Sequence, residues 1–325
     1  RALLAACPKA EAQLALTGDK SFLISPDDSA FLAYADTGGT LVAQGDPVGN
    51  SEAGRALIRR LRENADRTGR RVAFYAASED YLTAYLDVGL SILKIGEVAR
   101  IDLSHFTLDG PARKDFRYAK GRAQREGHGF DVIPAGDANH LLPELRRVSD
   151  AWLAQKQGEE KAFSLGAFSD DYIANFDIAM IRHTETGRII AFANLWQGAD
   201  RAEISADLMR YDPDGPSYAM DALFAELLLW SKEQAFAWFS LGGAPFSGLG
   251  DQRFTPFWNR MGNLLFEHGE RFYNFEGLRA FKEKFDPVWS PQYLASTGGL
   301  AVPQVLYEIN VLVSGGVKGL LRPGR

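Results

Sequence analysis

The amino-acid sequence predicts an α/β (α+β) protein with two domains, each built on a mixed sheet covered by helices. Its 325 residues exceed what a single core of ordinary size needs, and they are 46% hydrophobic and 24% charged, as in globular domains. Strand-like and helical runs alternate along the whole chain, which is typical of this fold class. An Asp-Gly-Pro turn at 109–111 marks the expected division into residues 1–106 and 107–325.

In the first half, strands are expected where short apolar runs lie between turn residues. These strands are 22–25, 30–36, 39–46, 72–77 and 92–103. Helices are expected where apolar residues recur at every third or fourth position. These helices are 8–17, 51–68 and 81–88, the last closed by Gly89. Ser51 stands at the start of the longest helix and is its expected N-cap.

The second half repeats this order of helix, antiparallel strands, long helix and strand, with no residue-level repeat. Its expected strands are 130–134, 177–183, 188–198, 201–211 and 238–245. Its expected helices are 112–126, 141–156 and 217–234, while 162–173 reads as a loop with a helical start. Segments 254–266 and 272–285 are helical or mixed, and the tail closes with a strand and a helix.

No apolar run reaches the roughly 18–20 residues that a membrane-spanning helix needs. The strongest candidate, 302–321, is interrupted by Glu308 and Lys318. It is expected either to pack on the core or to rest on a membrane as an amphipathic segment. The only cysteine, Cys7, excludes an intrachain disulfide and is typical of a reducing compartment. Because the chain begins with Arg1 rather than Met, we expect it to be part of a longer protein.

The net charge of −6 argues against a surface coated with positive charge for nucleic acid, although a local basic patch still steers such a partner. Cations gather in two helical stretches. The first contains Arg55, Arg59, Arg60, Arg62, Arg67, Arg70 and Arg71. The second contains Arg113, Lys114, Arg117, Lys120, Arg122 and Arg125 and is nearly free of acids. Each is either a solvated helix face or a surface for phosphate groups.

A candidate site begins on the strand at 201–211, where Glu203, Ser205 and Asp207 alternate and so share one face. Arg210 follows Asp207 by three residues, so the two side chains converge only if the strand bulges or ends there. The alternative is the polar outer face of an edge strand. The loop that follows contains Asp212 and Asp214, which would repel a pyrophosphate. These two residues argue against a binding site for coenzyme A.

A second candidate region combines cations with aromatic residues at 275–295. Arg279 and Lys282 are three residues apart, on one helix face, with Lys284 close by. Such cations suit a phosphate-bearing partner or a developing oxyanion, and a solvated helix over an apolar belt is the alternative. The glycine-rich turn at 242–248, which includes Ser247, lacks the Lys-Ser/Thr of a P-loop and suits close approach to a substrate.

No metal or cofactor is expected. The five histidines show no ligand spacing, and there is no Gly-x-Ser-x-Gly elbow. Cys7 lies in an N-terminal helix outside both predicted sheets and is a poor nucleophile candidate. These observations favour direct transfer in a ternary complex over an acyl-enzyme intermediate.

Four sequence blocks, in order, resemble the C-terminal catalytic domain of the MprF family, the bacterial lysyl- and alanyl-phosphatidylglycerol synthases. They are RKDFRYAKGRAQREGHGFDVI (113–133), SADLMRYDPDG (205–215), SLGGAPFSGL (240–249) and FEGLRAFKEKFDPVWSPQYLA (275–295). Weaker agreement extends to AQGDPVG (43–49). The resemblance implies tandem GNAT-like domains joined by the basic helix, and a tunnel where lipid and aminoacyl-tRNA meet from opposite sides.

The resemblance also implies an N-terminal transmembrane part outside this chain, and a place at the cytoplasmic face of the cell membrane. It ties Asp207, Arg210 and Lys282 to activity, with Glu203, Arg279, Lys284 and Ser247 as substrate-binding neighbours. The expected tRNA contacts are Arg113, Lys114, Arg117, Lys120 and Arg122. The expected partners are aminoacyl-tRNA, phosphatidylglycerol and the membrane surface.

The expected reaction moves an amino acid from aminoacyl-tRNA to the glycerol hydroxyl of phosphatidylglycerol. Lysine is preferred to alanine because it is the commoner product in the resembled group, and no residue decides between them. A Fem-like ligase that acts on a peptidoglycan precursor is a second hypothesis, and a non-catalytic module that binds tRNA or lipid is a third. A coenzyme A-dependent acetyltransferase comes last.

Overall fold

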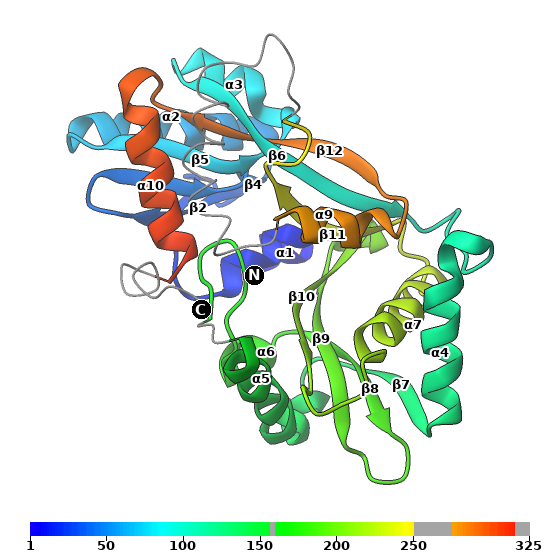
Figure 1. Cartoon of the computed structure of the whole chain (residues 1–325). Coiled ribbons are helices and arrows are strands. Elements are labelled where there is room, and N and C mark those ends of the chain that lie inside the picture. Colours follow the sequence, from blue (N-terminus) through cyan, green and yellow to red (C-terminus); the bar gives the residue numbers. More distant parts are fainter. Residues whose placement is uncertain (157–159, 250–274, 316–325) are drawn as a thin grey trace.

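The computed structural model describes residues 1–156, 160–249 and 275–315 (Figure 1). Twelve strands in these ranges form one continuous sheet, in the order β1-β2-β3-β5-β12-β6-β11-β10-β9-β8-β7, with β4 paired to β2. The sheet runs through two lobes, and the predicted mixed α/β fold is confirmed. No helix in the described ranges is long and apolar enough to cross a membrane.

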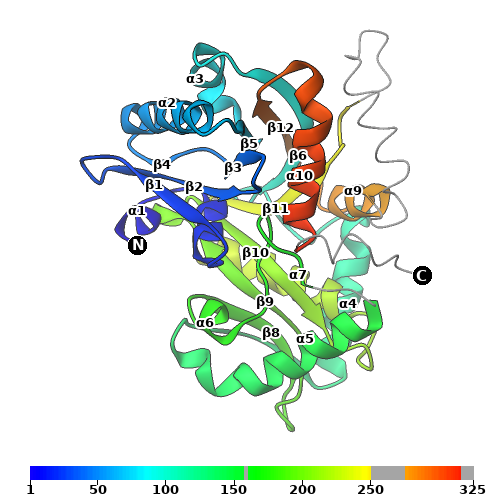
Figure 2. The same cartoon turned by 90° about the vertical axis from the view of Figure 1, so that its left-hand side faces the viewer.

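The N-terminal lobe opens with α1 (Ala2–Ala5) and a short 3₁₀ helix, η1 (Ala10–Leu16). Its strands are β1 (Ser21–Ile24), β2 (Ala30–Asp36), β3 (Thr40–Gln44), β4 (Val48–Gly49), β5 (Arg71–Ala77) and β6 (Ser91–Asp102). Helices α2 (Ser51–Arg67) and α3 (Leu82–Asp87) pack on one face of these strands, where Leu57 and Tyr85 meet Phe74. Figure 2 shows α10 (Val302–Val313) on the opposite face, where Val305 packs with Val42.

The start of α2 corrects one prediction. Its N-cap is Asn50, not Ser51: the Asn50 side chain accepts hydrogen bonds from the backbone N–H groups of Glu52 and Ala53. Asn50 has extended backbone angles, whereas Ser51 is the first residue of the helix. An N-cap must lie outside the helical conformation for its side chain to reach the free N–H groups of the first turn, and Asn50 meets that condition.

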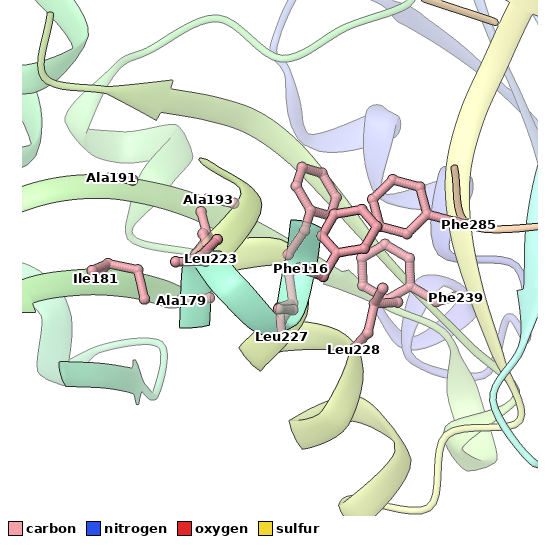
Figure 3. Packing of buried hydrophobic residues seen from close by; sticks show 14 of the residues in the cluster. Phe116, Ala179, Ile181, Ala191, Ala193, Leu223, Leu227, Leu228, Phe239 and Phe285 are labelled. Atoms are coloured by element: carbon pink, nitrogen blue, oxygen red, sulfur yellow. The ribbon is translucent and has the colours of Figure 1, made fainter. Parts of the chain in front are cut away.

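The C-terminal lobe repeats the layered arrangement. Its strands are β7 (His128–Ile133), β8 (Asp177–His183), β9 (Ile189–Gln197), β10 (Glu203–Tyr211) and β11 (Trp238–Pro245). Helices α4 (Lys114–Arg125) and α7 (Ala219–Glu233) cover one face, and α5 (Leu142–Lys156) and α6 (Asp170–Ile173) cover the other. Figure 3 shows the first of these two cores, where Phe116, Phe239 and Phe285 gather above Leu227 and Leu228.

Several predicted segments differ in detail. The segment at 162–173 has its helix, α6, at the end rather than at the start. The predicted segment 254–266 lies outside the described residues, and 272–285 contains α9 (Phe275–Glu283). The tail forms β12 (Val288–Ser296) and α10, and α10 packs on the core in the way expected for one reading of 302–321.

The two lobes share strands. The long strand β6 pairs with β12 along one edge and with β11 along the other, so it belongs to both lobes. Strand β12, from the end of the chain, pairs with β5 of the N-terminal lobe. Segments from both sides of residue 106 thus contribute to each lobe. The division into domains after residue 106 stays a prediction.

Within the described ranges, each lobe contains one parallel strand pair joined by a crossover helix. In the N-terminal lobe, α2 lies between β3 and β5, and in the C-terminal lobe α7 lies between β10 and β11. The β10–β11 ladder has only three residue pairs and ends at Ser205 and Ser240. Beyond that point β10 continues along β9 while β11 continues along β6, so the two parallel strands separate.

Candidate functional site

A bulge in β10 places Asp207 and Arg210 on the same side of the sheet. The register against β9 shifts between Ala206 and Met209, immediately beyond the place where β10 and β11 separate. A bulge adds one residue to a strand and so reverses the alternation of faces. The sequence required such a bulge for these two side chains to converge, and the structure confirms it.

Asp207 is a buried carboxylate held by three donors. Its Oδ1 accepts the backbone N–H of Gly166 at 3.0 Å. Its Oδ2 accepts the Tyr172 hydroxyl at 2.7 Å and the Asn194 amide at 3.3 Å. The residue is 8% exposed, and this burial raises the pKa of Asp207 against the lowering effect of its donors. Trp196 donates to the Tyr172 hydroxyl at 3.0 Å and so fixes the phenol.

Arg210 lies beside Asp207, and its contacts include an ion pair and a stacked aromatic ring. Its guanidinium donates to Glu160 Oε2 at 2.8 Å and stacks on the Trp152 ring, 4.1 Å from its centroid. Its positive charge lowers the pKa of Asp207, against the larger effect of burial. The side chain is 7% exposed. Arg210 therefore supplies a preorganised cation on the face that carries Asp207.

Lys282, near the end of α9, lies against β11 close to the same strand separation. Its ammonium donates to the carbonyl oxygens of Gly242 and Gly243 at 2.9 and 2.7 Å. The residue is 4% exposed, and burial lowers the pKa of Lys282 to about 7. Phe285, just beyond the end of α9, packs in the core of the C-terminal lobe (Figure 3). This packing holds Lys282 against β11.

Asp207 on β10 and Lys282, which extends from α9 to the carbonyl oxygens of β11, thus lie near the place where these two strands separate. The partners of Asp207 come from β9, α6 and the loop at 160–169, whereas those of Lys282 come from β11. Among the described residues, neither side chain is within hydrogen-bonding distance of the other. Ser205 and Ser240 mark the last point where the two strands touch, through a 2.9 Å bond from the Ser205 hydroxyl.

A second charged group gathers around Glu97 on β6. Its carboxylate accepts from Ser247 at 2.8 Å, from Lys94 at 2.8 Å and from Arg279 at 2.9 Å. Burial raises the pKa of Glu97, but these donors outweigh it and the net pKa is lowered. Arg279 also bonds the Ser247 hydroxyl and stacks on Trp289, 4.4 Å from the ring centroid. Ser247 and Arg279, both predicted to bind substrate, thus contact each other, and their role in substrate binding stays a prediction.

Other predicted substrate contacts lie apart from these groups. Glu203 faces the N-terminal segment, where its carboxylate accepts the backbone N–H of Ala10 at 3.0 Å. Burial raises the pKa of Glu203. Lys284 is exposed, with its ammonium over the Phe281 ring at 5.6 Å.

Most cations of the predicted tRNA helix have partners within the chain. Arg113 donates to the carbonyl oxygens of Lys284 and Phe285, at the end of α9. Arg117 donates to Leu108 and Gly110, Lys120 pairs with Glu226 on α7, and Arg122 pairs with Glu126. Lys114 is exposed. The helix thus combines lobe-stabilising ion pairs with a partly exposed cationic surface.

Sequence reasoning missed three parts of this site. Lys94 and Glu97 interrupt an apolar strand, and that interruption was a usable signal. Tyr172 and Asn194 are ordinary core residues by pattern, so nothing local marked them as partners of Asp207. Gly166 could be recognised only in space: a Cβ atom there would lie 2.0 Å from Asp207 Oδ2.

A mixed sheet in two lobes, each with a parallel pair around a crossover helix, defines a tandem GNAT-like fold, with a charged site at the strand separation. The same fold is seen in FemX, with a TM-score of 0.59 at 10% sequence identity, over 94% of this chain and 97% of that one. The family model described as phosphatidylglycerol lysyltransferase, C-terminal, matches residues 1–296, and the chain belongs to this family.

Two solved structures are similar over nearly the whole chain. The C-terminal domain of a protein described as a lysylphosphatidylglycerol synthetase from Agrobacterium fabrum has a TM-score of 0.88 at 40% identity, covering 98% of this chain and 96% of that one. The L-PGS structure from Bacillus licheniformis has a TM-score of 0.86 at 37% identity, covering 97% and 95%.

Curated relatives carry the name phosphatidylglycerol lysyltransferase. The Bacillus subtilis protein is 37% identical over 301 residues, which are 92% of this chain and 35% of the relative. The Staphylococcus xylosus protein is 34% identical over 281 residues, which are 86% of this chain and 33% of the relative. The chain therefore spans about a third of the length of these relatives.

Proposed function

We propose that this chain transfers lysine from lysyl-tRNA to the terminal glycerol hydroxyl of phosphatidylglycerol. The observation that carries the proposal is the buried carboxylate of Asp207 where β10 and β11 separate, with Lys282 of α9 bound to the backbone of β11. The names of the relatives, at 34–37% identity, support lysine as the transferred amino acid. The proposal gives the chain aminoacyl-tRNA and phosphatidylglycerol as substrates.

The chemistry asks little of the protein beyond positioning and electrostatics. The ester of lysyl-tRNA is already activated, and attack by the glycerol hydroxyl forms a tetrahedral intermediate that releases the tRNA 3′ hydroxyl. The hydroxyl proton must leave the nucleophile, and a proton must reach the departing oxygen. Holding both substrates in line accounts for a large part of such a rate enhancement.

Asp207 is proposed to hold the α-ammonium of the lysyl group or to assist removal of the hydroxyl proton. Its burial makes the carboxylate a stronger electrostatic partner than an exposed acid, because water does not screen it. Arg210 and Lys282 are proposed to hold the lipid phosphate and to offset negative charge on the intermediate. A phosphate bound beside Lys282 would raise the pKa of its amine and favour the charged form.

The surface around α4 is proposed to meet the acceptor arm of tRNA. Binding then depends on counterion release and weakens as salt rises. Lys114→Gln is the informative change because Lys114 is exposed, whereas Arg113 and Arg117 support backbone carbonyls. We expect weaker tRNA binding with a salt slope reduced by about one. Arg59→Gln, an exposed cation on α2, is the matched control.

We also propose that the reaction takes place at a membrane surface, because phosphatidylglycerol is a membrane lipid. In the longer protein, an N-terminal transmembrane part would hold this chain at the cytoplasmic face. That arrangement accords with the greater length of the relatives.

The test is to incubate the purified chain with phosphatidylglycerol vesicles and labelled lysyl-tRNA, then to separate the lipids by thin-layer chromatography. Labelled lysyl-phosphatidylglycerol is the expected product. Parallel reactions with alanyl-tRNA and with a peptidoglycan precursor test the alanine and Fem-like alternatives. Binding of tRNA or vesicles without any product would instead support a non-catalytic module and would refute the proposal.

A further inference from the structure

The N-terminal segment after η1 reaches across to the loop at 160–169, which touches the candidate site. Asp19 Oδ2 accepts the backbone N–H of Phe163 at 2.7 Å. Phe163 is buried and has a φ of 64°, in the left-handed region that a bulky side chain rarely adopts. The hydrogen bond that the Asp19 carboxylate accepts from Phe163 therefore holds this loop in a conformation that the loop alone disfavours.

The same loop contacts both charged residues of β10. Gly166 donates its N–H to Asp207, and Glu160 accepts from Arg210. A displacement of this loop would thus remove one donor from Asp207 and the ion-pair partner from Arg210 together. The end of α10 also holds the 160–169 loop, because Ala162 donates its N–H to the carbonyl oxygen of Val313 at 3.2 Å.

Lys20, next to Asp19, is a buried cation in this junction. Its side chain is 0% exposed, and the ammonium contacts Asp19 at 2.6 Å and the Thr17 hydroxyl at 2.7 Å. It also lies over the Phe163 ring, 5.3 Å from the centroid. A lysine side chain is almost never fully buried unless its charge is paired. Burial lowers the pKa of Lys20, while the charges of Asp19 and Asp207 oppose that shift.

We propose that Asp19 and Lys20 are positioning residues that complete the candidate site from the N-terminal segment. Asp19 fixes the 160–169 loop against Asp207 and Arg210. Lys20 supplies a buried positive charge that favours the ionised form of Asp207. The effect on catalysis rests on the proposed lysyl transfer. The effect on the conformation of the 160–169 loop does not depend on that function.

The proposed role of Lys20 predicts the direction in which the pKa of Asp207 moves when the Lys20 charge is removed. Among the described residues, the charged and titratable groups around Asp207 are Tyr172 on α6, Arg210 with its partner Glu160, and Lys20 with its partner Asp19. Removing the Lys20 cation disfavours the carboxylate, so the pKa of Asp207 rises further. The acid limb of the pH–rate profile then moves to higher pH in Lys20→Met and returns in Lys20→Arg.

The experiment compares Asp19→Asn, Asp19→Ala, Lys20→Met and Lys20→Arg with the unmodified chain. Lys9→Met is the matched control, since Lys9 lies on the same segment but pairs with Asp80. Amide hydrogen exchange is followed for the peptide that contains 160–169. Lysyl transfer is followed as kcat and as KM for lysyl-tRNA, across pH, and thermal melting confirms that each variant folds.

For Asp19→Ala we expect about tenfold faster exchange in the loop and a 10- to 100-fold fall in kcat, with KM changed less than about threefold. Unchanged exchange in a folded Asp19→Ala variant would overturn the positioning role, as would loosened exchange with unaltered kcat. A pH profile of Lys20→Met that matches the unmodified chain would overturn the electrostatic role. If the unmodified chain makes no lysyl lipid, the proposed function fails while the exchange result still decides the loop contact.

Discussion

At the scale of single residues, Asp207 holds a carboxylate where water has little access. Its three donors, on Gly166, Tyr172 and Asn194, come from a loop, a helix and a strand. Burial nevertheless raises the pKa of Asp207, so the ionised form is held against its desolvation cost. Perturbed carboxylates of this kind are common where a protein uses charge for chemistry.

Asp207→Asn should reduce lysyl transfer by about 100-fold or more, because the amide keeps the size of the side chain but loses the negative charge. The measurement is the initial rate of lysyl-lipid formation. Asp131→Asn serves as the control, since Asp131 pairs with Arg182 at the far edge of the sheet. Transfer by Asp207→Asn within threefold of the unmodified chain would contradict the assigned role.

Lys282→Met should abolish transfer yet stabilise the fold. Burial lowers the pKa of Lys282 from 10.5 to about 7, so between these values the unfolded chain holds a proton that the folded chain lacks. The stability of the unmodified chain therefore increases as pH rises through this window, and below it the folded state bears the full cost of the buried charge.

The gain from Lys282→Met is accordingly larger at pH 6 than at pH 9, on the order of 1 kcal/mol or more at the lower pH. Denaturant unfolding at the two pH values measures it. Lys284→Met, at an exposed neighbour on the same segment, should leave stability unchanged at both. A destabilised Lys282→Met variant at pH 6 would show that the two carbonyl hydrogen bonds outweigh desolvation.

At the scale of elements, the site depends on two irregularities of the sheet. The bulge in β10 turns Asp207 and Arg210 to one face, and the short β10–β11 ladder lets the strands separate beside them. Helix α9 then places Lys282 against the carbonyl oxygens of Gly242 and Gly243 on β11, and Arg279 against Glu97. A regular, fully paired strand would offer neither arrangement.

The start of α2 gives a stability test at this scale. Asn50→Ala should lower the free energy of unfolding by about 1 kcal/mol, because it removes the side-chain acceptor for two N–H groups. Ser51→Ala should change it by less than about 0.5 kcal/mol. Thermal or denaturant unfolding of the two variants decides between the residues, and the reverse ranking would restore Ser51 as the cap.

At the scale of the whole molecule, the end of the chain completes the beginning. Strand β12 lies between β5 and β6, and α10 covers the face opposite α2. Ion pairs also span this connection, as between Arg71 and Glu308 at 2.8 Å. The N-terminal segment in turn packs into the C-terminal lobe, where Ala10 and Leu14 join the core next to α5.

A fragment of residues 1–106 should therefore not fold stably by itself. Without β12 it would leave the facing edges of β5 and β6 unpaired and the core around Val42 uncovered. Circular dichroism and the dispersion of amide NMR signals measure this. Adding residues 286–315 as a separate peptide should restore structure, whereas a cooperatively folded fragment on its own would support residue 106 as a true domain boundary.

The sequence by itself determined the order and type of most elements, the fold class and the family. Periodicity and turn residues act over a few neighbours, so strands such as β2 and β11 could be located from local pattern. It also marked Asp207, Arg210, Lys282, Ser247 and Arg279 as candidates. The need for a bulge followed from spacing alone, because side chains alternate along a strand.

Only the tertiary structure decided which distant segments meet. The bond from Gly166 to Asp207 spans 41 residues, and that from Phe163 to Asp19 spans 144. Glu97 and Ser247 are 150 residues apart, and β12 inserts between strands from the other end of the chain. Such contacts are set by how whole elements pack, since local patterns specify an element's faces but not the partner that covers each face.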